Sequence, residues 1–369
     1  MRTDERMMLT MKRRTAWTCL AFLILPLLLC ACGTSAEVAV MSSSSSSSAV
    51  TASTTVSENG KTSTQAGETM LRFSDVGWDS IRFHNAVARF VLENAYGYKT
   101  EEISGTTPIT YPALQQGDVD VLMEMWTDNV PTYEQDVADK KVLELSVNFD
   151  DDAQGVYVPR YVIEGDSERG VAPMAPDLKK VSDLSKYANV FADPEEPGKG
   201  RLYGAVSGWN IDKVLHLKYI ALGLSENFTY FSPGSDAALA AAFTSAFEKG
   251  QAIAGYYWEP TWLTGKYDLV RLGDEPYDAK TFNDGIGDFP AVRVTICANP
   301  ALPEKAPDAA AFLQHYKTSS ELTATALAYM NDTKADYLTT AKWFLKENQT
   351  LWADWLPADA CAKVRDALK

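Results

Sequence analysis

The chain has 369 residues, of which 46% are hydrophobic and 11% aromatic, enough to build one large domain or two lobes. Its formal net charge is −15, and because the first 31 residues carry five basic and two acidic side chains, the remainder carries −18. This acidic balance argues against nucleic acid or an anionic surface as a partner.

The N-terminal segment has the composition of a lipoprotein signal peptide. Basic residues at 12–14 precede an uncharged, largely apolar stretch at 16–29, and Leu29-Cys30-Ala31-Cys32 has the form of a lipobox. The apolar stretch is too short for an ordinary membrane span. We therefore predict a signal peptide at 1–31 and lipidation of Cys32, with an uncleaved anchor helix as the alternative.

The segment that follows, residues 32–70, has the composition of a flexible tether. It contains seven consecutive serines at 42–48 and is rich in Ser, Thr and Gly. Such a segment buries too little apolar area to fold by itself. A lipid anchor followed by a tether predicts a domain that works just outside a membrane, on the outer face of the cytoplasmic membrane or facing a periplasm.

The first part of the folded region alternates strands and helices. We expect strands at 71–76, 101–104, 119–125 and 155–162, a helix from Ser80 to a stop at Gly97, and a short helix at 112–116. This alternation is typical of a parallel sheet with βαβ crossovers, and therefore of an α/β fold.

A loop rich in Gly, Pro and Asp after Val162 predicts a crossing into a second lobe. The expected elements there are strands at 201–206 and 251–257, a helix at 210–222, and a helix between an N-cap at Ser235 and a stop at Gly250. A strand at 290–298 then returns to the first lobe, and the remainder is mostly helical. These elements place lobe 1 at 71–162 and 289–369, and lobe 2 at 163–288.

The cysteines and histidines give no sign of a metal site. Cys297 and Cys361 follow the predicted signal, and outside the cytoplasm they either pair as a disulfide or remain two buried thiols. Histidine occurs only at His84, His216 and His315, without an HExxH or CxxC pattern. Because a G-x-S-x-G elbow and a Walker A sequence are also missing, we expect neither an enzyme nor a bound cofactor.

Four tryptophans stand where a predicted strand ends or a helix begins: Trp78, Trp126, Trp209 and Trp258. In open α/β sheets, ligands bind in the crevice at the carboxyl ends of the strands. Tryptophan is also the best aromatic face for a cation without hydrogen-bond donors, such as a quaternary ammonium. The alternative is that each ring is a core residue, but four rings at such junctions favour a ligand cage.

Polar groups near these tryptophans predict what else the ligand carries. The turn at 207–209 leads into a helix whose first backbone N–H groups, at Asn210 and Ile211, are suited to an anion. The alternative is an ordinary turn with a tryptophan that only packs. The carboxylates of Asp79 and Glu124 would help to attract a cation to this crevice. The alternative is that they are ordinary carboxylates exposed to solvent. A cation beside an anion is the charge pattern of glycine betaine.

The segment 256–262 is dense in aromatic residues, and its strand periodicity separates them. Tyr256 and Trp258 share one face of the strand while Tyr257 lies on the other, so only some of them can line one cleft. We assign Trp258 to the site and Trp262 to packing. Three further tryptophans are expected in a helical core: Trp343, Trp352 and Trp355.

Three segments carry a resemblance to a known family: GDVDVLMEMW, DPEEPGKGRLYGAVSGWN and YYWEPTWLTGKYDLV. From about Leu71 to its end, the chain resembles the substrate-binding proteins of ABC importers for glycine betaine and related compounds. The resemblance implies a type II periplasmic-binding-protein (venus flytrap) fold, in which two lobes close over the ligand. It also implies a box of three tryptophans, here Trp126, Trp209 and Trp258, and carboxylate binding by the amides of Asn210 and Ile211.

Two departures from that family bear on the ligand. Some members place a histidine four residues after the first box tryptophan to hold the carboxylate, and here Val130 stands there. Choline-binding relatives have an Asp two residues after a Trp, whereas Asp79 directly follows Trp78 and Ser80 comes next. The second departure favours a carboxylated ligand.

The sequence thus predicts a lipid-anchored protein that binds glycine betaine or a related quaternary ammonium compound. It would deliver this ligand to an ABC permease with its ATPase. The alternatives are a choline- or carnitine-specific protein of the same fold and a sensory surface lipoprotein.

Overall fold

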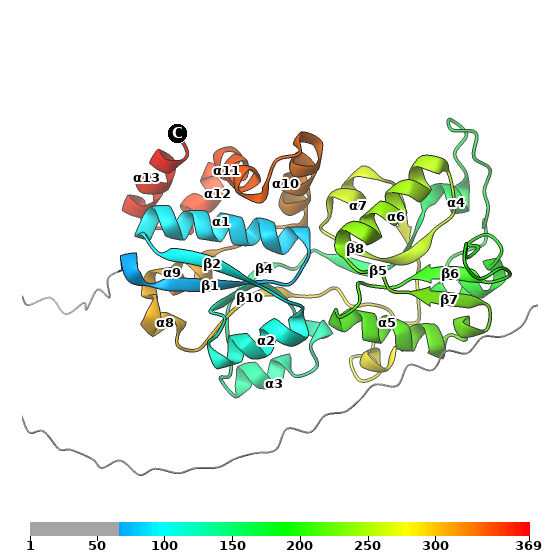
Figure 1. Cartoon of the computed structure of the whole chain (residues 1–369), viewed down its shortest axis with the longest axis horizontal. Coiled ribbons are helices and arrows are strands. Elements are labelled where there is room, and N and C mark those ends of the chain that lie inside the picture. The colour runs from blue at the N-terminus through cyan, green and yellow to red at the C-terminus, as the bar shows by residue number, and fades with distance from the viewer. Residues whose placement is uncertain (1–65) are drawn as a thin grey trace, which may run out of the picture. The chain divides into compact units, whose positions relative to one another are not determined.

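The computed structural model describes residues 66–369, which form two mixed β-sheets with helices packed against them (Figure 1). The predicted signal peptide, Cys32 and most of the predicted tether lie outside the described residues. The end of the predicted tether belongs to the fold, because the 3-10 helix η1 spans Ala66–Glu68 and Met70 pairs with Lys99 in the first strand. The fold therefore begins slightly before the predicted Leu71.

The first sheet has the strand order β2-β1-β3-β10-β4. Its strands are β1 (Met70–Asp75), β2 (Lys99–Ser104), β3 (Val121–Trp126), β4 (Leu143–Phe149) and β10 (Val294–Ala298). β1 is parallel to β2 and β3, whereas β10 is antiparallel to β3 and β4. Four of these strands are predicted by the sequence. The fifth, β4, is not, although its sequence LELSVNF alternates apolar and polar residues as a half-buried strand does.

The second sheet repeats this plan in the order β7-β6-β8-β5-β9. Its strands are β5 (Ala153–Pro159), β6 (Gly200–Tyr203), β7 (Phe228–Phe231), β8 (Ala254–Glu259) and β9 (Leu269–Arg271). β6 is parallel to β7 and β8, and β5 is antiparallel to β8 and β9. Four strands of each sheet therefore run in the same direction, as a parallel sheet predicts, and one strand, β10 in the first sheet and β5 in the second, runs against them. The short strands β7 and β9 are also missing from the predicted elements.

The first crossing between the sheets lies earlier than predicted. The predicted strand at 155–162 was assigned to the first lobe, but β5 pairs with β8 and β9 and so belongs to the second sheet. The chain therefore crosses at 150–152, and residues 160–164 form the short helix α4 rather than a strand. Only three residues separate β4 from β5, which is too few for a crossover helix that would mark the change of sheet. The apolar pattern of β5 does not by itself indicate which sheet the strand joins.

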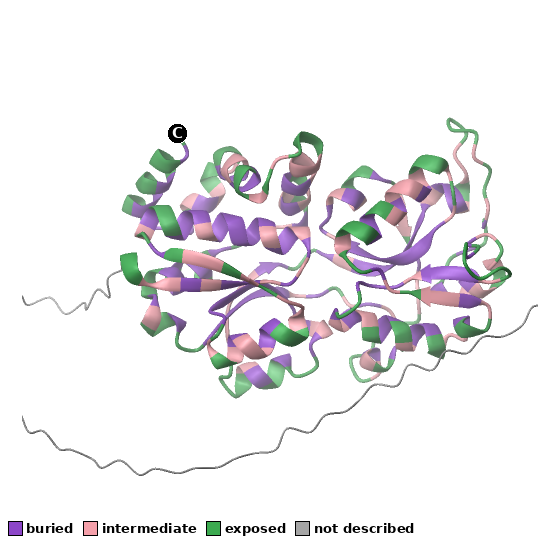
Figure 2. Cartoon of the chain, viewed as in Figure 1, coloured by how far each residue is buried: buried purple, intermediate pink, exposed green. Residues whose placement is uncertain are grey.

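Helices cover the sheets, and in α1, the longest of the described helices, most residues are buried (Figure 2). It packs on β1, β2 and β3 and is covered by α11 and α13 from the end of the chain. The helices are α1 (Asp79–Tyr96), α2 (Thr107–Gln116), α3 (Tyr133–Ala138), α4 (Arg160–Glu164), α5 (Asn210–Ala221), α6 (Asp236–Lys249), α7 (Trp262–Lys266), α8 (Leu302–Lys305), α9 (Pro307–His315), α10 (Ser320–Thr333), α11 (Tyr337–Glu347), α12 (Gln349–Ala353) and α13 (Ala358–Ala367). The predicted helical C-terminal region is confirmed.

Several helix ends occur where the sequence predicts them, although α2 begins at Thr107 and not at the predicted residue 112. Gly97 (φ 81°) and Gly250 (φ 63°) adopt the left-handed conformation that ends α1 and α6. The hydroxyl of Ser235 accepts a hydrogen bond from the backbone N–H of Ala238 (3.1 Å) and so caps α6. These local signals are reliable because each depends on only a few neighbouring residues.

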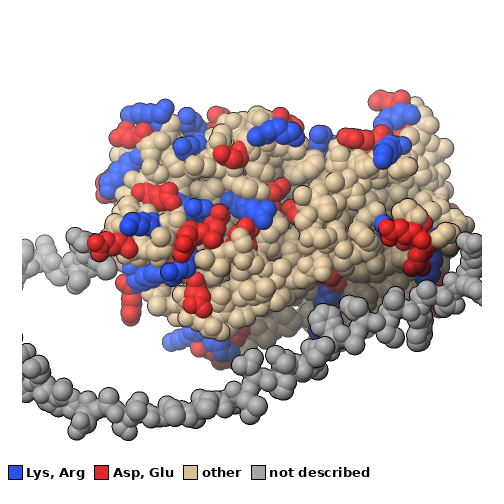
Figure 3. Space-filling view, in the orientation of Figure 1, with Lys and Arg blue, Asp and Glu red and all other residues tan. Residues whose placement is uncertain are grey.

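The surface carries charges of both signs. On the face seen in Figure 3, acidic and basic side chains are interspersed rather than gathered into one patch of a single sign. Ion pairs such as Arg72–Glu101 (2.9 Å) and Arg89–Glu102 (2.9 Å) join neighbouring elements of the first lobe. Within the described part of the chain, no helix combines the length and apolar character needed to cross a membrane.

The first crossing segment contains a buried acid, Asp152, that gives the fold a pH dependence. It is 7% exposed and neither of its carboxyl oxygens has a hydrogen-bond partner. Burial raises the pKa of Asp152 to about 8, and the neighbouring charges of Asp151 and Asp128 add to this shift. The folded protein therefore holds this proton over a range in which the unfolded chain has lost it, so the carboxyl lowers stability as the pH rises from about 4 to 8.

We expect Asp152→Asn to stabilise the protein by about 2 kcal/mol or more at about pH 8 and to change stability little at about pH 4.5. Urea unfolding of both proteins at the two pH values measures this difference. An equal effect at both pH values would contradict it, because the substitution would then act through packing rather than charge.

Candidate functional site

All four predicted tryptophans line one pocket between the two lobes. Trp78 precedes α1 and Trp126 ends β3, both in the first lobe, while Trp209 precedes α5 and Trp258 lies in β8 of the second. Their exposures are only 4–8%. The pocket is completed by seven further residues: Thr107, Glu124, Asn129, Val130, Asn210, Ile211 and Tyr256.

Trp209 is the central ring of this pocket. Its centroid lies 5.2 Å from that of Trp78 and 5.1 Å from that of Trp258, with interplanar angles of 80° in both cases. These are edge-to-face contacts, the arrangement that aromatic quadrupoles favour. The three rings therefore form a continuous aromatic wall from one lobe to the other. Trp126 lines the same pocket, and its ring packs against Phe149 (6.2 Å).

Two glycines allow the backbone turns that present these rings. Gly77 (φ 102°) precedes Trp78, and Gly208 (φ 93°) precedes Trp209. A Cβ atom at position 208 would also lie 3.3 Å from the side chain of Thr106 in the other lobe. Glycine is required at 208 both for its left-handed backbone and for this close approach between the lobes.

The N-terminus of α5 supplies two hydrogen-bond donors to the pocket. Trp209 is the N-cap residue, so Asn210 and Ile211 are the first residues of the helix, and both line the pocket. No acceptor within residues 66–369 receives a hydrogen bond from either of their backbone N–H groups. Together with the helix dipole, two such donors favour an anionic group.

A polar cluster closes one side of the pocket. Gln154 of β5 faces Asn129 of the first lobe, and their side-chain amides exchange long hydrogen bonds of 3.4 and 3.5 Å. The hydroxyl of Tyr256 donates to the same Gln154 carbonyl oxygen (3.0 Å). Tyr256 is identifiable from the sequence because it shares a strand face with Trp258. Thr107 and Asn129 carry no comparable signal.

Asp79 does not join the tryptophans, contrary to the prediction. Its carboxylate accepts a hydrogen bond from the hydroxyl of Tyr337 (2.7 Å) and is not among the groups that line the pocket. It faces the start of α6 instead, where burial, together with the charge of Asp79, raises the pKa of Asp236 to about 7. As the first residue of α1, Asp79 points away from the side on which the preceding Trp78 lies.

The other predicted aromatic and cysteine residues occupy packing positions. Trp262 is absent from the pocket lining, and Trp355 stacks on Tyr316 (4.3 Å) in the helical region, as expected. Cys297 and Cys361 are both buried and free, so of the two predicted alternatives the structure has separate thiols. Among the described residues there is no group of three or more His, Cys, Asp or Glu side chains arranged to hold a metal ion.

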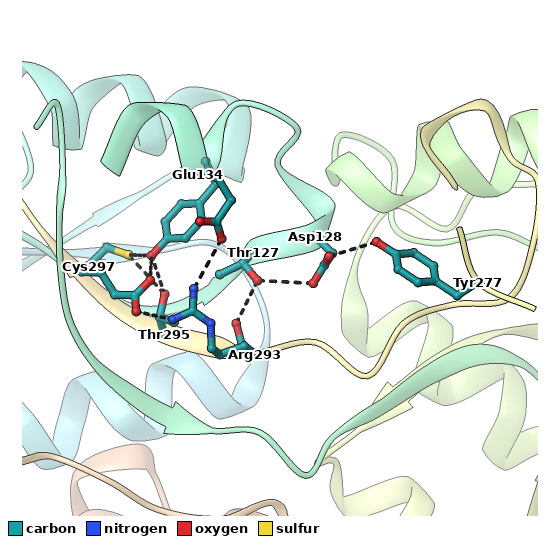
Figure 4. A network of polar contacts seen from close by, with 9 residues as sticks. Thr127, Asp128, Glu134, Tyr277, Arg293, Thr295 and Cys297 are labelled. Atoms are coloured by element: carbon teal, nitrogen blue, oxygen red, sulfur yellow. Dashed lines mark hydrogen bonds and ion pairs between the residues drawn. The ribbon is translucent and has the colours of Figure 1, made fainter. Parts of the chain in front are cut away.

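The segment after Trp126 is attached both to the return crossing and to the second lobe (Figure 4). The Thr127 hydroxyl donates to the carbonyl oxygen of Arg293 (3.1 Å), which directly precedes β10. The hydroxyl of Tyr277, from the second lobe, donates to Asp128 (3.1 Å). The Tyr277–Asp128 hydrogen bond is thus a polar contact between the lobes beside the pocket.

We expect Tyr277→Phe to favour separation of the lobes and to weaken ligand binding by roughly twofold to fivefold, because a half-exposed hydrogen bond to a carboxylate contributes about 1 kcal/mol or less. Calorimetric titration with stopped-flow measurement of the dissociation rate tests this, and the loss is expected in the dissociation rate. A changed association rate with an unchanged dissociation rate would contradict it.

Comparisons with solved structures show which fold the protein has. A choline-binding protein of an ABC transporter, solved with choline, superposes with a TM-score of 0.63 at 22% identity, covering 81% of this chain and 98% of that one. Lactococcal OpuAC, in its closed conformation with glycine betaine, gives a TM-score of 0.59 at 17% identity, covering 79% and 100%. With two α/β lobes and a cleft between them, the protein has the type II periplasmic-binding-protein fold.

The family follows from the sequence match. Residues 69–347 match the model of the substrate-binding domain of the ABC-type glycine betaine transport system, and the chain belongs to this family. It is therefore a substrate-binding protein of a transport system and not an enzyme. A trimethylamine N-oxide-binding protein of Pelagibacter ubique (strain HTCC1062) is 24% identical over 264 residues, which cover 69% of this chain and 81% of that protein.

Proposed function

We propose that this protein binds glycine betaine or a closely related quaternary ammonium compound in the tryptophan pocket and delivers it to an ABC permease. The observation that carries the proposal is the convergence of Trp78, Trp126, Trp209 and Trp258 on one pocket that also receives the N-terminus of α5. A trimethylammonium group has no hydrogen-bond donors, so aromatic faces are its natural partners, each contributing roughly 0.5–2 kcal/mol.

The helix N-terminus supports a ligand with an anionic end. The amides of Asn210 and Ile211 are available to a carboxylate, and Val130 takes the place where some relatives carry a histidine. Carboxylate binding here would therefore rest on backbone donors and the helix dipole. Asp79 is engaged by Tyr337 and is not positioned to receive the hydroxyl of choline. This arrangement favours betaines over choline.

Lobe closure over the ligand completes the proposed mechanism. We propose a first lobe of Ala66–Phe149 and Val294–Lys369, and a second lobe that begins at Ala153 and includes β5 to β9. Because Trp209 of the second lobe contacts Trp78 of the first, the aromatic wall is continuous only when the lobes are together. A ligand that touches both lobes stabilises the closed state through its higher affinity for that state.

Isothermal titration calorimetry of the purified protein tests this function. The panel is glycine betaine, proline betaine, carnitine, choline and trimethylamine N-oxide, the last being the compound in the name of the Pelagibacter relative. We expect the betaines to bind best and Trp258→Ala to abolish measurable binding, while Trp343→Ala, which removes a ring stacked on Tyr329 in the helical region, does not. Failure of the whole panel to bind would refute the proposed function.

We also propose that Cys32 carries a lipid that holds the protein on the outer side of a membrane. The lipobox and the serine-rich tether support this placement. We expect the wild type to sediment with membranes and Cys32→Ala to be found in the soluble fraction after secretion. Cell fractionation, with mass spectrometry of the N-terminal peptide, measures both, and membrane association of the variant would contradict lipid anchoring.

A further inference from the structure

The most unusual polar group of the pocket is Glu124, a carboxyl in the middle of a fully buried strand. It is 1% exposed and lines the tryptophan pocket from β3. One of its oxygens, Oε2, accepts hydrogen bonds from the indole N–H of Trp78 (2.7 Å), the hydroxyl of Ser80 (3.1 Å) and the indole N–H of Trp126 (3.4 Å). A single carboxyl oxygen thus holds two of the four tryptophans.

The other oxygen, Oε1, has no hydrogen-bond partner. The ring of His84 lies beside it, with Nε2 3.6 Å from Oε1. This histidine does not neutralise Glu124, because burial lowers the pKa of His84 to about 3 and leaves its ring uncharged at neutral pH. The ring is engaged by the hydroxyls of Tyr316 (2.8 Å) and Thr323 (3.3 Å).

Glu124 therefore has no counter-cation among the described residues. Within residues 66–369, no lysine or arginine forms an ion pair with Glu124, and the one contact of this kind is with uncharged His84. A buried carboxylate without a partner is costly unless a cation approaches or the group takes up a proton. Burial accordingly raises the pKa of Glu124 to about 7, even though its three hydrogen bonds act in the opposite direction.

We propose that Glu124 is the specificity-determining residue of the pocket: its carboxylate is the counter-anion of the bound cation, and it also fixes the rings of Trp78 and Trp126. This role rests on the proposed function. It makes Glu124 the group by which the pocket distinguishes a charged ligand from an uncharged ligand of the same shape. Hydrogen bonds from both indole N–H groups to one anion polarise the rings, which strengthens their attraction for a cation. Aromatic faces also bind neutral groups of the same shape. A buried carboxylate, in contrast, favours a positively charged group such as trimethylammonium.

This role predicts a pH dependence with a defined sign. A cation binds best when Glu124 is ionised. The affinity of the pocket for a cation is therefore highest at a pH above the pKa of Glu124 in the free protein, and it falls by up to about tenfold per pH unit below that pKa. Tyr316 and Tyr256 remain uncharged in this window because burial raises the pKa of each well above its usual value. Asp152 and Asp236 also titrate there, but neither lines the pocket, so comparison with a Glu124 variant isolates the effect of Glu124.

The test compares a ligand that carries a trimethylammonium group with an analogue of the same shape that carries an uncharged tert-butyl group in its place. Glycine betaine and tert-butylacetate differ in replacing the ammonium nitrogen by carbon, and choline can be compared in the same way with its tert-butyl analogue. We expect Glu124→Gln to weaken the binding of the trimethylammonium ligand on the order of tenfold to a hundredfold and the binding of its tert-butyl analogue far less. We also expect the pH dependence of the cation's affinity to disappear in this variant.

Glu144→Gln is the matched control, since Glu144 is a carboxylate of β4 that accepts a hydrogen bond from Tyr133 (2.6 Å) and does not line the pocket. The ratio of the two affinities is also measured in the wild type between about pH 5 and 8, which requires no variant to fold. A constant ratio, or equal weakening of both ligands by Glu124→Gln, would overturn the role of Glu124 while leaving the proposed function intact. Failure of every cation to bind would refute the proposed function and this inference with it.

Discussion

Trp209→Ala is expected to weaken the binding of glycine betaine by about 30- to 1,000-fold, or roughly 2–4 kcal/mol. The substitution removes one face for the cation and both edge-to-face contacts that join the rings of Trp78 and Trp258. None of the other three rings touches two members of the cage in this way. Truncating Trp209 therefore separates the halves of the aromatic wall that belong to different lobes.

Calorimetric titration and intrinsic tryptophan fluorescence measure this loss. Trp209→Phe is expected to recover part of the affinity, because it keeps an aromatic face in the same place. Trp343→Ala serves as the matched control, since Trp343 stacks on Tyr329 (4.1 Å) in the C-terminal helices. Thermal unfolding of each variant verifies that binding is compared between folded proteins. Unchanged affinity in folded Trp209→Ala would rule out a central role for this ring.

Asp274→Ala is expected to lower the free energy of unfolding by about 3–5 kcal/mol, the usual effect of leaving one partner of a buried ion pair alone. Lys218 of α5 is 1% exposed, and its Nζ lies 2.6 Å from the Asp274 carboxylate. The same ammonium group donates to the carbonyl oxygen of Gly287. Lys218 thus anchors the loop after β9 to α5, the helix whose first residues line the tryptophan pocket.

The double variant Lys218→Met with Asp274→Ala distinguishes a charge effect from a packing effect. It removes both charges, so we expect it to regain much of the stability that the single substitution loses. Urea unfolding of the two single variants and the double variant provides this cycle. A loss below about 1 kcal/mol in Asp274→Ala would show that solvent reaches the pair. Ligand affinity of the folded variants is expected to change little, because Lys218 lies in the last turn of α5, whereas the residues of this helix that line the pocket, Asn210 and Ile211, lie in the first.

The sequence by itself predicts most of the elements and most of the pocket. Helix ends at Gly97, Gly250 and Ser235 and the placement of the tryptophans at strand ends all follow from local patterns. Such patterns are readable because a left-handed glycine, a capping hydroxyl or the end of a strand depends on a few neighbouring residues. The carboxyl ends of neighbouring parallel strands meet at one edge of a sheet, so the two tryptophans of each sheet could be expected to lie near each other.

Which residues meet across long distances in the chain was decided only by the tertiary structure. The apolar sequence of β5 suits either sheet, and its pairing with β8 and β9 places it in the second. Asp79 and Glu124 are equivalent as acidic residues beside tryptophans, yet one is held by Tyr337 and the other by two indoles. Strand partners, buried hydrogen bonds and the lack of a counter-cation for Glu124 all depend on contacts between distant segments. Local sequence patterns therefore placed the four tryptophans at the ends of elements, and only the packing of β3 against α1 brought a buried carboxyl, Glu124, against two of them.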